Sequence, residues 1–302
     1  MRLSFTVPPE DHGKTVKNIL KTRLSLSERL IKKLKFSGKI LLNSLPSFIN
    51  AAVHESDLLE ALVELDEYNE DIIPEPMHID IIYEDENLVV INKPSSMVVH
   101  PTFRHFSGTM ANGLMHYLLQ KGIRTLVRPV SRLDRDTSGI IVFALNPFLQ
   151  ERLIRQMRSN SYIKEYIGLV HGTYEESFGT ISLPIERLPG SMMLRHTTAE
   201  GAPSVTHYEV LERFDDATFL KFTLETGRTH QIRVHCQATG HSLIGDTLYP
   251  HHDLLGKYEG LISRQALHSA RTVFTHPVTN KILELEAPIP ADISKVLEIL
   301  RK

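Results

Sequence analysis

Short apolar runs bounded by turn residues divide much of the chain into segments of strand length. Two of these runs, at 79–83 and 88–92, are separated by four polar residues and predict a β-hairpin. Longer runs predict further strands at 140–145, 162–170, 205–211 and 218–224.

Apolar residues at helical spacing predict helices near 107–120, 147–158, 230–238 and 291–301. The predicted strands are grouped by short turns and do not alternate regularly with these helices. This grouping favours an α+β fold, with a largely antiparallel mixed sheet flanked by helices, over a doubly wound α/β fold.

The N-terminal part of the chain predicts a helix of a different kind. Between residues 26 and 34, apolar side chains recur at helical spacing with cationic side chains mostly between them. Ser25 and Glu28 have the spacing of a capping box, which predicts the start of the helix, and Gly38 is placed to end it. A short strand at 39–43 is predicted to follow.

Charge is distributed unevenly in this region, although the net charge of the chain is only −2. Nine Lys or Arg and a single acid lie between Lys14 and Lys39, whereas thirteen acids and no Lys or Arg lie between Glu55 and Glu86. Two solvated surfaces would explain this pattern as well as a functional surface would. A cationic helix that runs into a strand also suits contact with a phosphate backbone. The candidate basic face comprises Arg29, Lys32, Lys33 and Lys35.

Length and composition indicate a globular protein of two domains. The chain has 302 residues, of which 41% are hydrophobic and 23% charged. An acidic segment with two prolines, at about 64–77, predicts a linker between domains over 1–70 and 78–302. The N-terminus lacks a signal-peptide core, no apolar run could span a membrane, and a single cysteine, Cys236, excludes an internal disulfide. We therefore expect a cytoplasmic protein without a membrane partner.

A dense polar loop precedes the predicted strand at 140–145 and carries the best candidate for chemistry. Asp134 lies in it between Arg132 and Arg135, and Asp136 follows. A loop that exposes a carboxylate, next to a rigid strand that fixes it, is the layout that catalysis needs. Aspartates in such loops are also common turn formers, so the loop alone leaves both roles open.

Two other segments carry polar side chains that could join this carboxylate. On the predicted helix near 230–238, with Thr229 as its N-cap, His230 and Arg233 share a polar face. An arginine held there could lock a carboxylate by two parallel hydrogen bonds, although a solvated helix face is the alternative. On the strand at 162–170, Lys164 and Tyr166 point to the same side, where a tyrosine could stack on a base or simply pack in the core.

These segments resemble, in order, the motifs of the RluA-type pseudouridine synthases. The loop is similar to the family's H-R-L-D-x-x-T-S-G, with Ser131 in place of the histidine. Residues 164–166 are similar to its K-x-Y motif and residues 227–233 to its G-R-T-H-Q-[IL]-R motif. Flanking stretches extend the resemblance over roughly 79–290, with Ser96 where the N-K-P segment usually has glycine.

The resemblance implies the pseudouridine synthase fold and the isomerisation of specific uridines to pseudouridine in structured RNA, without a cofactor or a metal. Asp134 would be the catalytic aspartate, Tyr166 would stack on the base, and Arg233 would pair with Asp134. The target uridine would be flipped out of its stack. Further contacts with the substrate RNA are expected from Arg132, Ile232, Lys164, Arg228 and His230.

The N-terminal basic helix, strand and turn resemble a small α+β S4 RNA-binding domain, with Ser44 where a glycine is usual. Such a domain ahead of this catalytic domain implies large-subunit (23S) ribosomal RNA as the most expected substrate, with tRNA as the alternative. Which uridine is modified is not encoded in residue spacing. A monomer is the default expectation.

Three other functions remain open from the residues. Asp134 to Thr137 superficially matches the D-x-D-x-[TV] pattern of aspartyl-phosphate phosphatases, but no hydrophobic strand precedes it. His230, His235 and His241 could belong to a metallohydrolase, although a spacing of five places the first two on different helix faces. A non-catalytic RNA-binding protein would need only the basic N-terminal segment.

Overall fold

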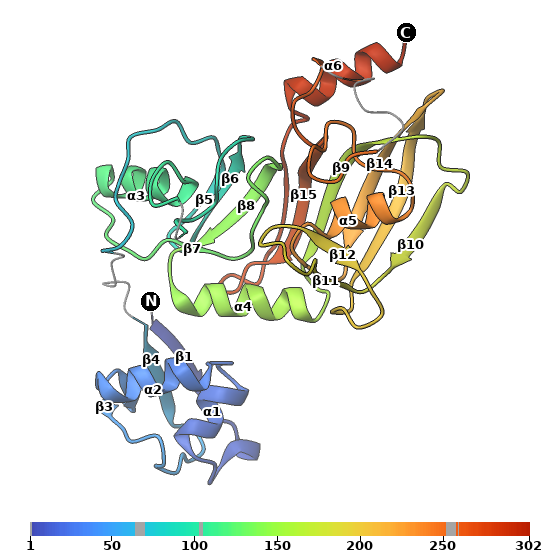
Figure 1. Cartoon of the computed structure of the whole chain (residues 1–302). Helices are drawn as coiled ribbons and strands as arrows, with labels where there is room; N and C mark the ends of the chain where they lie inside the picture. The colour runs from blue at the N-terminus through green and yellow to red at the C-terminus, as the bar shows by residue number, and fades with distance from the viewer. Residues whose placement is uncertain (1, 64–69, 103–104, 252–257, 259) are drawn as a thin grey trace.

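The computed structural model describes residues 2–63, 70–102, 105–251, 258 and 260–302, which form two units (Figure 1). The first unit has a four-stranded antiparallel sheet in the order β1-β4-β2-β3. Its elements are β1 (Arg2–Thr6), α1 (Val16–Thr22), α2 (Glu28–Phe36), β2 (Ile40–Leu42), β3 (Leu45–Pro46) and β4 (Leu58–Leu62).

The start of α2 differs from the sequence prediction. The capping box of Ser25 and Glu28 is wrong, because Ser27 is the N-cap and its side chain accepts a hydrogen bond from the Leu30 N–H at 3.2 Å. Ser25 instead has a φ of 56°, and Glu28 is the first helical residue. Gly38, with a φ of 67°, ends the helix as predicted.

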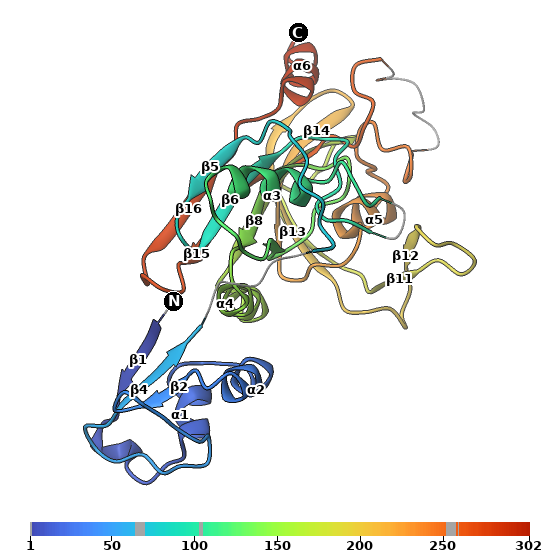
Figure 2. The same ribbon diagram turned by 90° about the vertical axis from the view of Figure 1, so that its left-hand side faces the viewer.

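The second unit is built on a ten-stranded sheet, in the order β10-β13-β14-β9-β15-β8-β6-β5 with β16 paired to β15 and β7 to β8. Helices pack around this sheet, and one of them, α6, lies at the end of the molecule opposite the first unit in both views (Figures 1 and 2). Its elements are β5 (Ile81–Glu84), β6 (Leu88–Lys93), α3 (Met110–Gln120), β7 (Arg128–Pro129), β8 (Ser138–Ala144), α4 (Pro147–Arg158), β9 (Ile163–His171), β10 (Phe178–Ser182), β11 (Ile185–Arg187), β12 (Arg195–Thr197), β13 (Val205–Arg213), β14 (Ala217–Leu224), α5 (Gln231–Ala238), β15 (Leu267–Thr275), β16 (Ile282–Glu286) and α6 (Ala291–Leu300).

The predicted α+β architecture is confirmed. The hairpin appears as β5 and β6, the four longer runs as β8, β9, β13 and β14, and the four helices as α3, α4, α5 and α6. The central strand β15 and its partner β16 were not predicted as strands. Among the pairs formed by the described strands, β15 and β8 are parallel and the others antiparallel.

The parallel junction of β8 and β15 brings two backbones unusually close together. Ser269 lies opposite Gly139, which has a φ of 106°. A Cβ atom built on Gly139 would lie 2.2 Å from the Ser269 carbonyl oxygen. Only glycine fits this position, because L side chains avoid the dihedral angle and the partner is backbone that cannot rotate away.

The segment predicted as a linker at 64–77 is only partly a connector. Residues 64–69 lie outside the described residues. In the remainder, Ile72 is buried in the hydrophobic cluster of α3, and the Glu75 carboxylate accepts a hydrogen bond from the Gly108 N–H at 2.8 Å. The second half of this segment therefore packs on the second unit. No helix within the described part of the chain combines the length and apolar character that crossing a bilayer requires.

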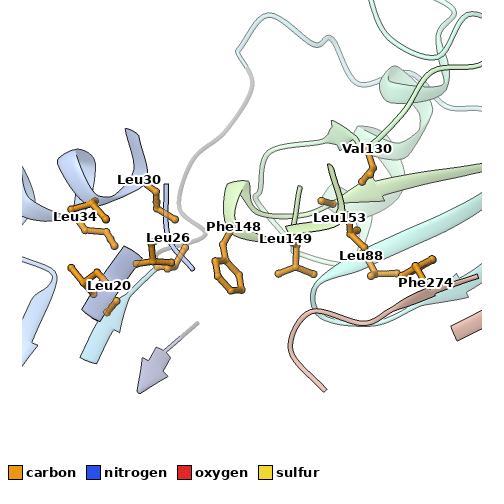
Figure 3. Packing of buried hydrophobic residues seen from close by; sticks show 14 of the residues in the cluster. Leu20, Leu26, Leu30, Leu34, Leu88, Val130, Phe148, Leu149, Leu153 and Phe274 are labelled. Atoms are coloured by element: carbon orange, nitrogen blue, oxygen red, sulfur yellow. The ribbon is translucent and has the colours of Figure 1, made fainter. Parts of the chain in front are cut away.

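The two units share one hydrophobic cluster, and α4 lies between the large sheet and the first unit (Figures 1 and 2). Leu26 from the first unit and Phe148 from α4 are both buried in it, and Phe148 lies between Leu26 and Leu149 in Figure 3. The Arg155 guanidinium also donates to the Ser25 carbonyl oxygen at 3.2 Å. Contacts of both kinds fix α2 beside α4.

The Gly139→Ala substitution should lower the free energy of unfolding by about 3 kcal/mol or more, because the new methyl group collides with the β15 backbone. Urea unfolding followed by circular dichroism measures this change. Gly122→Ala is the matched control: Gly122 has a φ of 74° but open space around its Cβ position, so about 1 kcal/mol is expected there. Equal losses in both variants would contradict a close approach at the junction.

Candidate active site

Asp134 lies in the loop between β7 and β8, and Arg233 of α5 reaches it from 99 residues further along the chain. The Arg233 guanidinium donates through one NH1 group to Asp134 Oδ2 at 3.2 Å. The Asp134 side chain is 24% exposed, whereas that of Arg233 is 8% exposed. The structure therefore brings the two predicted partners together, with the carboxylate open to solvent and its cation almost covered.

The geometry of this pair differs from the expected one. The two-pronged contact of Arg233 is with Asp246, whose oxygens accept from Nε at 2.7 Å and from NH2 at 2.8 Å. Asp246 is fully buried, and its Oδ1 also accepts the backbone N–H groups of Leu248 and Tyr249, both at 3.0 Å. The predicted lock of Arg233 on Asp134 by two parallel hydrogen bonds is wrong, because Asp246 occupies that face of the guanidinium.

The two carboxylates beside the Arg233 guanidinium set its pKa. Burial opposes the charge of Arg233, but the contacts with Asp246 and Asp134 outweigh it and raise the pKa of the guanidinium. The Arg233 guanidinium also lies 5.1 Å from the centre of the Tyr249 ring. Arg233 is thus a permanently charged and closely held partner for Asp134.

His230 lies beside this pair and begins α5. It has a left-handed φ of 59° and is the N-cap, so the prediction of Thr229 as N-cap is wrong. The Thr229 hydroxyl accepts a hydrogen bond from the exposed Arg132 guanidinium at 3.2 Å. His230 Nδ1 lies 2.8 Å from the Tyr249 hydroxyl, and its Nε2 lies 3.9 Å from Asp134 Oδ1. Desolvation lowers the pKa of His230, although Asp134 opposes this.

Tyr166 on β9 provides an apolar wall next to the carboxylate. It is buried in one hydrophobic cluster with Ile232, against which Leu133 of the loop also packs. Burial and the nearby Asp134 charge raise the pKa of the Tyr166 phenol, and a side-chain hydrogen bond with Ser269 opposes this. The loop, β9 and α5 therefore meet around Asp134, as expected from the sequence.

The other predicted contact residues are spread more widely. Burial lowers the pKa of Lys164, whose ammonium lies 3.6 Å from the position of a Cβ built on Gly227. Arg228 is exposed and donates to the Pro203 carbonyl oxygen at 3.3 Å, so it does not join Asp134. The four residues of the basic face lie on α2, in the other unit.

Buried donors hold the backbone of the loop, and sequence reasoning missed them. Lys93, which is fully buried, donates from Nζ to the carbonyl oxygens of Pro94 at 2.8 Å and of Met97 and Arg135 at 2.9 Å. Arg264 donates to the Asp136 carbonyl oxygen at 3.1 Å. Neither residue stands out by periodicity; only the N-K-P segment pointed to Lys93. Asp246 gave no signal in the sequence.

The three histidines considered as metal ligands have different partners. His235 lies 2.9 Å from both the Thr206 hydroxyl and the Leu183 carbonyl oxygen, and His241 lies 2.9 Å from the His171 carbonyl oxygen. Within the described ranges, no three His, Cys, Asp or Glu side chains are grouped as metal ligands would be.

Comparison with known proteins bears on this site. A family model described as RNA pseudouridylate synthase matches residues 87–238, which include the loop, β9 and α5. An uncharacterized RNA pseudouridine synthase of Bacillus subtilis, YjbO, is 39% identical over 276 residues, covering 91% of this chain and 95% of its own. Ribosomal large subunit pseudouridine synthase D of Neisseria meningitidis serogroup B is 35% identical over 309 residues, covering 99% of this chain and 82% of its own.

A likeness to solved structures agrees with the sequence comparison. The human RNA pseudouridylate synthase domain containing 1 protein superposes with a TM-score of 0.58 at 25% identity, covering 75% of this chain and 97% of its own.

Lys93→Met should lower the free energy of unfolding by about 3 kcal/mol near pH 7, because three carbonyl groups lose a buried donor. Burial lowers the pKa of Lys93 to about 7 in the folded protein, well below its value in the unfolded chain. The unfolded chain therefore binds more protons between about pH 7 and pH 10, and the contribution of Lys93 to stability increases with pH there.

Urea unfolding at pH 7 and pH 9 tests this, with the difference between wild type and Lys93→Met expected to be larger at pH 9. Lys281→Met, at an exposed position, is the control and should change stability by no more than about 0.5 kcal/mol. A difference that shrinks as the pH rises would show that Lys93 is not a desolvated cation.

Proposed function

The chain belongs to the RluA-type RNA pseudouridylate synthase family, and from this we propose that it isomerises specific uridines of large-subunit ribosomal RNA with Asp134 as the catalytic carboxylate. The observation that carries the residue assignment is the contact of Asp134 with Arg233 at 3.2 Å. The relative from Neisseria meningitidis, which is named for the large ribosomal subunit, supports the choice of RNA.

The reaction rearranges bonds within one nucleotide. The C1′–N1 bond breaks, the uracil turns, and C1′ bonds to C5; C5 then loses its proton to water, and N1 takes one up. Nothing is oxidised and no group leaves, so protein side chains suffice to position and polarise the nucleotide. Because Arg233 engages only Oδ2 of Asp134, Oδ1 is left for the substrate.

A uridine must leave its stack to reach Asp134, which costs a few kcal/mol. We infer that Arg132 enters the vacated space. It is exposed on the same loop and donates to the Thr229 hydroxyl at 3.2 Å, and a planar guanidinium can stack and donate hydrogen bonds at once.

The flipped uracil would lie against Tyr166 and Ile232. A raised pKa keeps the Tyr166 phenol protonated at neutral pH, so it acts as a neutral stacking surface and proton donor and does not act as a phenolate base. His230, whose pKa is lowered, is neutral beside Asp134 and offers a hydrogen bond to the uracil edge. Lys164 and Arg228 would contact the flanking nucleotides.

The first unit, over about residues 1–70, would act as an S4-like RNA-binding domain, and the catalytic domain would follow from about residue 78. The exposed cations of α2 support this assignment, because cations on a helix position a phosphate backbone. They comprise Arg29, Lys32, Lys33 and Lys35.

Asp134→Asn should abolish turnover and leave RNA binding and the unfolding transition close to wild type. Tritium release from large-subunit ribosomal RNA transcribed with 5-[³H]-uridine measures turnover. Asp215→Asn, the same change at an exposed turn, should keep wild-type activity. Release by the Asp134→Asn variant would remove Asp134 from the reaction. RNA binding by a wild-type protein that releases no tritium would favour the non-catalytic alternative, and release from tRNA alone would move the substrate to tRNA.

Arg233→Lys should lower kcat about 100-fold or more, since an ammonium cannot hold Asp246 at two points and still reach Asp134. Single-turnover kinetics at saturating RNA measure the rate, and thermal unfolding checks the fold. Arg301→Lys is the control, because Arg301 makes a comparable contact with Glu212 at 2.7 Å on the exposed surface. A rate within threefold of wild type would show that Arg233 does not act on Asp134.

A further inference from the structure

A groove of about 390 Å³ lies where α2 of the first unit faces α4 of the second. Ser27 and Leu30 line it from one side, and Pro147, Gln150 and Ile154 from the other. The rest of its lining is almost entirely cationic. Among the described residues, these side chains are Arg29, Lys33, Arg128, Arg155 and Arg158, with Glu151 as the acid, 3.5 Å from Arg155.

The cations of the groove act on one another electrostatically. Burial, together with the charges of Arg128, Lys39 and Arg29, lowers the pKa of Lys33. Burial and the charge of Arg29 likewise lower the pKa of Arg128. The repulsion crosses the boundary between the units, since Arg29 and Lys33 belong to the first unit and Arg128 to the second. The charges of the two units therefore act on one another within a single groove.

The groove is built on fixed elements. Leu26 and Phe148 pack in the shared cluster beside it, as Figure 3 shows, and Arg155 ties α4 to the Ser25 carbonyl oxygen at 3.2 Å. Gln150 bridges to Arg128, because its amide oxygen accepts from the Arg128 guanidinium at 3.4 Å while its amide nitrogen donates to the Pro129 carbonyl oxygen at 3.0 Å. Side chains from both units are thus held around one concave surface.

The groove is also linked to the catalytic loop. Arg128 lies on β7, six residues before Asp134, and six residues of extended chain span at most about 20 Å. An RNA whose uridine reaches Asp134 therefore has neighbouring nucleotides within reach of the groove.

We propose that this groove binds the phosphodiester backbone of the same RNA that presents its uridine to Asp134, so that one RNA segment bridges the two units. The proposal rests on the proposed function. Five cations spread over two helices and a strand match a row of phosphates better than a single phosphate ion, and positively charged grooves of this kind track a nucleic-acid backbone. The proposal gives the four cations of the basic face of α2 different roles, because Arg29 and Lys33 line the groove whereas Lys32 and Lys35 do not.

Two paired variants of the full chain test the two sides of the groove: Arg29→Gln with Lys33→Gln, and Arg155→Gln with Arg158→Gln. The dissociation constant for a protein-free, unmodified large-subunit ribosomal RNA transcript is measured between about 50 and 300 mM KCl. Each phosphate contact contributes about 0.7 to 0.9 to the slope of log K against log salt. Each pair should therefore lower the slope by about 1 to 2 and weaken binding about tenfold at 150 mM salt.

Two control variants separate charge from other effects. Arg155→Lys with Arg158→Lys keeps both charges and should keep the wild-type slope, although it changes the contact of Arg155 with Ser25. Lys295→Gln with Lys302→Gln removes two exposed charges at the end of the molecule opposite α2 and should leave the slope unchanged. Thermal unfolding of each variant confirms that the fold is kept.

An unchanged slope in either groove pair overturns the proposal, because both sides must contact the RNA. An equal loss in the Lys295 and Lys302 pair would also overturn it, by showing a general charge effect. These outcomes are distinct from a failure of the proposed function, which would appear as wild-type protein that binds the transcript but releases no tritium from it.

Discussion

One guanidinium shared by two carboxylates is the interaction on which the candidate active site depends. Asp246 is fully buried and takes the two-pronged contact with Arg233, so the cation is fixed before any substrate binds. Removing one partner of a buried ion pair costs about 3–5 kcal/mol, which makes this pair hard to break. Asp134 meets the fixed cation through a single N–H group. It gains electrostatic stabilisation and still keeps an oxygen for chemistry, which a two-pronged contact would not allow.

The backbone around Asp134 is fixed by a second set of buried cations. Lys93 and Arg264 donate to the carbonyl oxygens of Arg135 and Asp136, directly after the carboxylate. The loop then enters β8 at the parallel junction with β15, where Gly139 allows the two backbones to approach. The loop that carries Asp134 therefore lies where the two halves of the large sheet join. This explains why side chains from β9 and α5 can converge on it.

Local sequence patterns predicted most helices and strands. The features that they did not predict depend on contacts between residues far apart in the sequence. The hairpin of β5 and β6 followed from two apolar runs around a polar turn, and the helices followed from apolar residues at helical spacing. The strand β15 was missed because charged and polar residues interrupt its apolar pattern, and its pairing partners lie far away in sequence. Local preference predicts Thr229 as the N-cap, but its hydroxyl accepts a hydrogen bond from the Arg132 guanidinium. Asp246 could not be predicted as a partner of Arg233, because a buried carboxylate paired with an arginine 13 residues away in the sequence leaves no local pattern.

The charges, too, are arranged in the fold in a way that their order along the chain does not show. The net charge of −2 gives no sign that the whole chain binds nucleic acid, whereas the concentration of cations before residue 40 favours such binding. From sequence, the cations of α2 form one basic face; in the fold, Arg29 and Lys33 turn toward α4 while Lys32 and Lys35 lie outside the groove. Cations on α4 that are unremarkable in sequence complete the surface. The apolar contact of Leu26 with the α4 cluster thus does more than bury area, because it sets α2 and α4 at the separation at which their like charges form one anion-binding surface.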